Sequence, residues 1–199
     1  MNAYDELLEK IHALENELKE EIQKKNKEFF YEVHRKRVEF EEATRLKHKQ
    51  LKTKILSYIQ GARFSVILTA PIIYSCLLPA VLLDIMVSIY QAICFPIYNI
   101  PKVKRSEHLI VDRQFLSYLN IIEKINCSAC GYFNGVISYV QEVAARTEQY
   151  WCPIKHARKV ATIHGRYQNF MDYGDAESYK EKLDEVRREF DDLRTHSDK

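Results

Sequence analysis

One stretch of the sequence, residues 64–100, is almost free of charge. Its 37 positions contain a single charged side chain, that of Asp84. The other 162 positions hold 57 of the 58 charged residues, so over a third of them are charged, against about a quarter in ordinary domains. The net charge of +2 and the mean hydropathy of −0.37 therefore average two very different kinds of chain. The pattern predicts an apolar membrane segment joined to very polar regions.

The apolar stretch consists of two uncharged blocks. Residues 64–83 are long enough for a transmembrane helix, whereas residues 85–100 are marginal for a full crossing. Basic residues flank the stretch on both sides: Ala43–Arg63 contains six Lys or Arg and no acid, and three basic residues follow the stretch (Lys102, Lys104 and Arg105). By the positive-inside rule, both termini are expected on the cytoplasmic side of the cell inner membrane. The prediction is a membrane-inserted helical hairpin, or a proline-bent re-entrant segment, with Asp84 near its turn.

Three other interpretations of this region stay open. In the first, the stretch is a buried hairpin in the core of a soluble protein, although no other segment is apolar enough to cover it. In the second, Asp84 lies inside the bilayer and points to a transporter or channel subunit, although no second charge is present to relay an ion. In the third, the basic run binds nucleic acid, but its position beside an apolar segment favours membrane lipids as partners.

The N-terminal region predicts one long amphipathic helix. Residues 3–60 contain no Pro or Gly. Apolar residues follow a heptad seam and then shift register: Tyr4, Leu7, Ile11, Leu14, Leu18, Ile22, Phe29, Val33 and Phe40. The same spacing recurs in a last helix that Gly174-Asp175 introduces: Tyr179, Leu183, Val186, Phe190 and Leu193. The seam predicts a coiled coil with this last helix, with a second copy of the chain as a homo-oligomer, or with a partner protein; a solvated helix without a partner is the alternative.

From Pro101 onward the chain predicts a small helical domain. Asp112 and Asn134 are placed to cap two helices, and Pro153 to open a third. No alternating strand pattern of useful length is evident, so the fold class is all-α. Four regions follow: residues 1–63 as the coiled-coil helix, 64–100 as the membrane segment, 101–174 as a metal-binding domain and 175–199 as the C-terminal amphipathic helix.

Three cysteines and a histidine have the spacing of a metal site, C-x2-C-x21-C-x3-H. The candidate ligands are Cys127, Cys130, Cys152 and His156. Residues 126–135, which hold the first half of this pattern, resemble a zinc knuckle, in which Gly131 permits the tight turn that points backbone N–H groups at the sulfurs. Three thiolates and one imidazole suit tetrahedral zinc better than iron. Because four protein ligands leave no open position, the predicted site is structural.

The cysteines also have other interpretations. In one interpretation, cysteines are simply small buried residues, and this is how we interpret Cys76 and Cys94 of the apolar stretch. In another, Cys152 is a redox thiol next to a helix N-terminus and His156, although it lacks a thioredoxin-type partner cysteine. If one metal ligand is not bound, a nearby carboxylate becomes a candidate general base: Glu123, Glu142 or Glu148.

These features together predict a membrane-anchored, zinc-binding helical scaffold or accessory protein. The alternative is a membrane-associated metallo- or thiol-dependent enzyme centred on Cys152 and His156. The sequence contains no phosphate-binding glycine loop, nucleophile elbow or HExxH motif, so it predicts no particular reaction.

Overall fold

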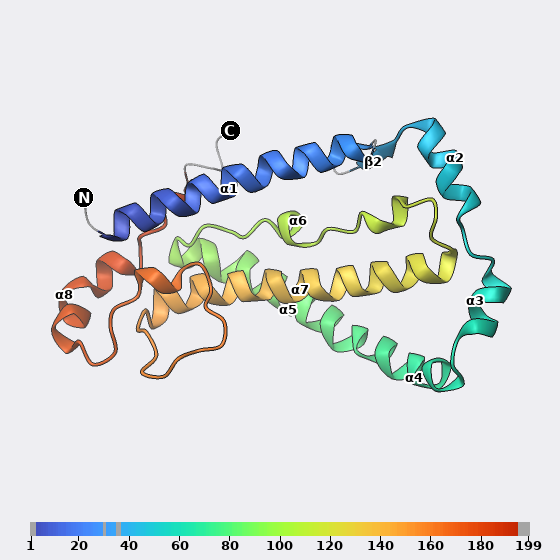
Figure 1. The fold of residues 1–199 in the computed structure, drawn as a ribbon. Coiled ribbons are helices and arrows are strands. Elements are labelled where there is room, and N and C mark those ends of the chain that lie inside the picture. The colour runs from blue at the N-terminus through green and yellow to red at the C-terminus, as the bar shows by residue number, and fades with distance from the viewer. Residues whose placement is uncertain (1–2, 30, 35–36, 195–199) are drawn as a thin grey trace. The chain divides into compact units, whose positions relative to one another are not determined.

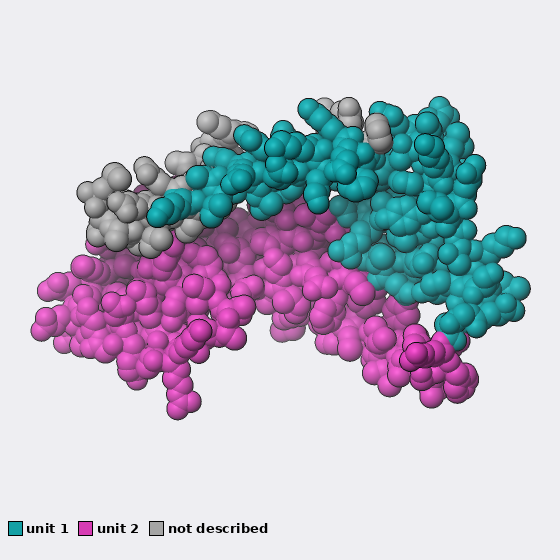
Figure 2. Space-filling view, in the orientation of Figure 1, with its two compact units in different colours: residues 1–62, 112–128 teal, residues 63–111, 129–199 magenta. Residues whose placement is uncertain are grey.

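The computed structural model describes residues 3–29, 31–34 and 37–194. Within these ranges the chain is mostly helical, and its strands form one two-stranded antiparallel sheet (Figure 1). The predicted helical fold class is therefore confirmed in outline. The chain divides into two compact units, which Figure 2 colours separately: unit 1 is Met1–Ala62 with Asp112–Ser128, and unit 2 is Arg63–Val111 with Ala129–Lys199.

Unit 1 contains helices and a β-hairpin. Its elements are α1 (Ala3–Glu28), β1 (Tyr31–His34), β2 (Arg37–Phe40), α2 (Glu42–Gln50), α3 (Ile55–Gly61), the 3-10 helix η1 (Arg113–Phe115) and the start of α7 (Ile121–Trp151). In the hairpin, Tyr31 lies opposite Phe40 and Val33 opposite Val38. The predicted single helix over residues 3–60 is thus wrong. The hairpin follows α1, and a further break separates the end of α2 at Gln50 from the start of α3 at Ile55.

The hairpin forms where apolar and polar residues alternate. The strand sequences Tyr-Glu-Val-His and Arg-Val-Glu-Phe repeat every second residue, which is the period of a strand. Val33 and Phe40, assigned above to a shifted heptad seam, are strand residues instead. The ring of Tyr31 contacts that of Phe40 at 5.4 Å between centroids, and Phe40 contacts His48 at 5.3 Å. His48 in turn contacts Tyr118 at 5.2 Å, so aromatic contacts join the hairpin to the rest of unit 1.

The heptad seam of α1 is only partly described. The side chains of Tyr4, Leu7 and Ile11 lie outside the described residues. Further along α1, Leu14 and Leu18 are more than 60% exposed. The coiled coil therefore stays a prediction.

Unit 2 is built around helices α5 and α7. Its elements are α4 (Phe64–Ser75), α5 (Leu77–Tyr98), α6 (Arg105–His108), α7 from Ala129 onward, the 3-10 helix η2 (Tyr167–Asn169), α8 (Ala176–Val186) and α9 (Asp191–Arg194). Between α5 and Asp112 the chain runs back alongside the two helices, and we call residues 99–111 the return segment (Figure 1). The core contains these buried side chains: Phe95, Ile100, Val103, Tyr139, Val143 and Phe190.

The chain reverses direction at the end of α5 through a left-handed residue. Asn99 has φ 56°, and the N–H of Ile100 donates to the carbonyl of Phe95 at 2.9 Å. This is the arrangement of a Schellman-type helix end, in which asparagine is the usual substitute for glycine. Pro101 follows two residues later and cannot continue the helix. The end of α5 therefore fixes where the return segment begins.

The start signal of the last helix is confirmed. The carboxylate of Asp175 accepts a hydrogen bond from the backbone N–H of Ser178 at 3.0 Å, as an N-cap does. The seam residues at the C-terminal side of α8 pack within unit 2: Val186 and Phe190 are buried, and Leu193 packs against the core. Pairing of this region with the N-terminal helix stays a prediction.

Three other predicted helix starts, at Asp112, Asn134 and Pro153, are wrong. Helix α7 begins after Asn120, not at Asp112 or Asn134, because Asn120 and Glu123 form a reciprocal capping box. Pro153 does not open a helix. Its carbonyl accepts from the N–H of Met171, and it is buried in an irregular segment.

Candidate functional site

The apolar stretch forms two consecutive helices, α4 and α5. Cys76 between them keeps right-handed helical backbone angles (φ −63°, ψ −18°), so the structure does not show the predicted hairpin. Together they give one helical stretch of 35 residues, Phe64–Tyr98, that is long and apolar enough to cross a membrane. No residue of α4 is buried. Helix α4 is therefore apolar and exposed on every side, and water does not offer such a surface favourable contacts.

Helix α5 has two faces of opposite character. Four of its residues are buried, on the side that packs in unit 2: Ala80, Asp84, Gln91 and Phe95. Two of these four, Asp84 and Gln91, are polar. Large aliphatic side chains occupy the exposed side, each at least 50% exposed: Leu78, Leu82, Ile85, Met86, Ile89, Ile93 and Ile97. We call these seven residues the outer face. Water-facing helices show the reverse arrangement, with polar residues outside and apolar residues inside.

Asp84 is paired on the inner side of α5. Its carboxylate accepts two hydrogen bonds from the Arg105 guanidinium, at 2.9 Å from Nε and 2.5 Å from Nη2. The hydroxyl of Tyr132 on α7 donates a third at 2.9 Å. The carboxylate raises the pKa of Arg105, and burial together with the same carboxylate raises the pKa of Tyr132. The prediction that Asp84 lies near a turn is wrong, because it lies inside α5.

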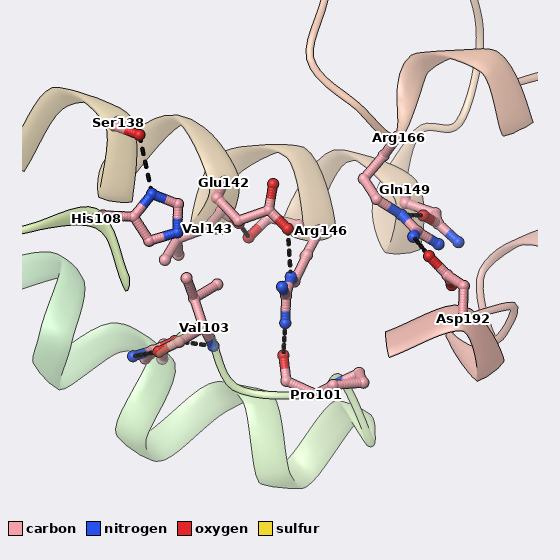
Figure 3. A network of polar contacts seen from close by, with 12 residues as sticks. Pro101, Val103, His108, Ser138, Glu142, Val143, Arg146, Gln149, Arg166 and Asp192 are labelled. Carbon is pink, nitrogen blue, oxygen red and sulfur yellow. Dashed lines mark hydrogen bonds and ion pairs between the residues drawn. The ribbon is translucent and has the colours of Figure 1, made fainter. Parts of the chain in front are cut away.

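A second polar group holds the return segment against α5. Gln91 accepts from the backbone N–H of Val103 at 2.9 Å and donates to the Val103 carbonyl at 3.2 Å. The Gln91 amide also donates to the Tyr139 hydroxyl of α7 at 2.6 Å. On the other side, Arg146 of α7 donates to the carbonyl of Pro101 at 2.8 Å and to Glu142 at 2.8 Å (Figure 3). Side chains of both helices thus satisfy the backbone groups of a segment that has no strand partner.

Two glycines let the return segment approach α7. A Cβ at Gly135 would lie 2.9 Å from the His108 carbonyl oxygen and 3.0 Å from the Cα of Leu109. At Gly131, one turn earlier, it would lie 3.4 Å from the Ile110 carbonyl oxygen. The predicted knuckle turn at Gly131 is therefore wrong: the residue is helical, and it lies where the backbones come close.

The four predicted metal ligands are not brought together. Cys127 and Cys130 lie within α7, whereas Cys152 and His156 follow its C-terminal end and are exposed. The 22 residues from Cys130 to Cys152 correspond to roughly 33 Å of helix. Within the described residues no group of three or more His, Cys, Asp or Glu side chains is placed to hold a metal ion. The structure thus does not support the predicted zinc site.

The candidate general bases have structural partners. Glu123 accepts from the N–H of Asn120, Glu142 pairs with Arg146, and Glu148 lies 3.1 Å from the His164 ring. His156 stacks on the Tyr167 ring at 6.3 Å between centroids, and all five cysteines are free thiols. These contacts bring no carboxylate to Cys152.

A third buried polar group, missed from the sequence, closes the C-terminal end of α8. Arg166 donates to Gln149 at 2.6 Å and to the Glu189 carbonyl at 2.8 Å, and it pairs with Asp192 (Figure 3). Gln149 donates to the carbonyls of Val186 and Glu189. The guanidinium thus satisfies a backbone carbonyl of the connection between α8 and α9.

None of the protein-family models, curated proteins and solved structures compared with the chain matches it.

Proposed function

We propose that this protein is a membrane-anchored helical scaffold or accessory protein, held at the membrane by α4 and α5. The observation that carries the proposal is the reversed polarity of α5, whose charged and amide side chains face the protein while its outer face is aliphatic. Polar groups inside and apolar groups outside are the arrangement that a bilayer favours. The exposed aliphatic side chains of α4 extend this surface.

The basic residues that flank α4 and α5 support a position on the cytoplasmic side of the membrane. Arg63 directly precedes α4, and Lys102 and Lys104 follow α5; all three are exposed. Basic residues near membrane segments remain on the cytoplasmic side and attract anionic lipid headgroups. The proposal therefore places the protein on the cytoplasmic face of the inner membrane. Its scaffold role rests on α1, which exposes Leu14, Leu18 and Ile22, spaced four residues apart along one helix face, for a second copy or a partner protein.

Flotation with lipid vesicles tests the anchor. We expect the purified protein to float with vesicles of phosphatidylethanolamine and phosphatidylglycerol, and to stay bound in high salt because burial of aliphatic side chains does not depend on salt. Changing Ile85→Glu and Ile89→Glu together on the outer face should weaken binding at least about tenfold, since each isoleucine loses its apolar transfer free energy.

The matched control changes Ile121→Glu and Ile163→Glu together, which adds the same two charges at exposed isoleucines outside α4 and α5. This variant should float like the unchanged protein. Recovery of the unchanged protein in the vesicle-free fraction would overturn the anchor. Equal loss of binding in both variants would contradict the assignment to the outer face.

A further inference from the structure

The direction of α5 relative to α7 and the return segment limits the orientations that α5 can adopt in the membrane. Three contacts align α5 with α7 in order along both helices. Asp84 meets Tyr132, Gln91 meets Tyr139, and Tyr98 stacks on Tyr150 with ring centroids 5.0 Å apart. The two helices therefore run side by side in the same direction, with the return segment beside them (Figure 1).

These neighbours carry charge along the length of α5. Lys104 and Glu107 of the return segment have side chains 55% and 65% exposed, and Glu142 and Arg146 form an ion pair on α7. If α5 crossed the bilayer, these groups would enter the hydrocarbon with it. Charged side chains at that depth cost free energy, and the exposed pair has no protein surface to cover it. A crossing orientation of α5 is therefore unfavourable.

Lying in the membrane plane removes this conflict. We infer that, as part of the proposed membrane anchor, α5 lies flat in one leaflet of an anionic phospholipid bilayer, with its outer face toward the acyl chains and α7 toward water. An amphipathic helix in the interface buries its apolar side in this way. Helix α4, which has no buried residue, enters the leaflet more deeply than α5.

Aromatic groups at the end of α5 and basic groups on the return segment agree with this orientation. The rings of Tyr98, Tyr150 and Trp151 contact one another at 5.0 to 5.3 Å, and Trp151 is 54% exposed. Tyrosine and tryptophan accumulate at the membrane–water boundary. Lys102 and Lys104 are exposed on the return segment, which runs back alongside α5, and in the in-plane orientation their ammonium groups reach anionic headgroups.

Depth-dependent quenching tests the inference. In a full-length variant with its cysteines replaced by serine, an environment-sensitive fluorophore is attached to a single cysteine at Leu78, Ile85, Ile93 or Ile97, and a further probe at Leu68 reports on α4. Vesicles of phosphatidylglycerol and phosphatidylcholine carry nitroxide quenchers at defined acyl positions. We expect equal, shallow depths for the four α5 probes and a greater depth at Leu68.

A crossing helix gives a different profile. Leu78 and Ile97 are 19 residues apart, about 28 Å along a helix, so their depths would fall near opposite headgroup regions with a maximum between them. That profile overturns the in-plane orientation while leaving membrane binding intact. Absence of quenching at every position, together with failure to float, overturns the membrane anchor itself.

Charge variants test the lipid that the surface selects. Lys102→Gln and Lys104→Gln should each weaken binding to phosphatidylglycerol vesicles about fivefold and leave the weaker binding to pure phosphatidylcholine unchanged. Lys180→Gln, at an exposed lysine of α8, serves as the control and should bind like the unchanged protein. Equal effects of all three changes would overturn the assignment of Lys102 and Lys104 to the lipid surface.

Discussion

Asp84 shows how a single charge is accommodated in an otherwise apolar helix. Its side chain is 8% exposed, and it meets a guanidinium and a phenol hydroxyl rather than lipid or water. The geometry is bidentate, which gives a guanidinium–carboxylate pair its direction as well as its strength. Arg105 is 48% exposed, so the pair bridges the protein interior and its surface.

Removing one partner of this pair should cost more than removing both. We expect Arg105→Leu to lower the free energy of unfolding by about 2 kcal/mol, since the buried carboxylate loses its cation. The double variant Asp84→Leu with Arg105→Leu should recover part of that loss. Denaturant unfolding in mild detergent, followed by circular dichroism, measures the coupling between the two side chains. Additive effects of the single changes would show that the pair contributes no interaction energy.

Sequence reasoning identified Asp84 but not its partners. Arg105 was assigned to a basic flank, and Tyr132 to a zinc knuckle. The seven-residue spacing shared by Asp84 with Gln91 and by Tyr132 with Tyr139 carries a signal, because such pairs repeat on one helix face. Nothing in the sequence shows that the two faces meet, since the contact depends on the path of the return segment.

At the scale of elements, helix α7 is the main surprise. Its 31 residues contain the sequence that resembles a zinc knuckle, and they remain helical throughout. The glycines there act in packing: they allow a backbone to lie against the helix where a side chain would collide. A short motif of cysteine and glycine does not separate these two uses, because both need a small residue.

The close approach at Gly135 predicts a position-dependent effect of one methyl group. Gly135→Ala should destabilise the protein by about 1–3 kcal/mol, because the new Cβ meets backbone atoms that cannot rotate away. Gly165→Ala is the matched control, since no atom lies within 4 Å of the added Cβ. Thermal unfolding compares the two. A loss of stability at Gly165 equal to that at Gly135 would contradict the packing role.

Element boundaries followed the sequence where local chemistry decides them. Asp175 caps its helix as predicted, and the Asn-x-x-Glu sequence of Asn120 and Glu123 is a local capping signal of the same kind. The hairpin of β1 and β2 was missed because its alternation was interpreted as a change of heptad register. A four-residue strand contains only two repeats of the apolar–polar alternation. The helical pattern of the neighbouring residues therefore dominates any longer stretch of sequence.

At the scale of the whole molecule, the described chain combines a strongly polar composition with a contiguous aliphatic surface. That surface extends over α4 and the outer face of α5 within unit 2. Such contiguous exposure marks an interaction site in a folded protein. The long apolar helical stretch could be predicted from the sequence alone, whereas the orientation proposed for it depends on the elements that accompany α5.

A lipid surface that binds only the folded protein should stabilise it. With lipid at about 100 times the dissociation constant, the expected gain is about 2.7 kcal/mol. For a chain of this size that raises the unfolding temperature by roughly 5–10 °C. Far-ultraviolet circular dichroism with and without phosphatidylglycerol vesicles measures the shift. The Ile85→Glu, Ile89→Glu protein should show a smaller shift, and an unchanged unfolding temperature in the parent protein would contradict the linkage.

The burial of Phe190 has a consequence for synthesis of the chain. This ring is 0% exposed in the same core as Phe95 and Tyr139, about a hundred residues after α5 begins. The core cannot close while the ribosome is still translating the sequence before Phe190. Throughout that interval the aliphatic helices have already emerged, without the packing that orients them. A nascent chain of this kind meets either a chaperone or the bilayer before it reaches its final structure.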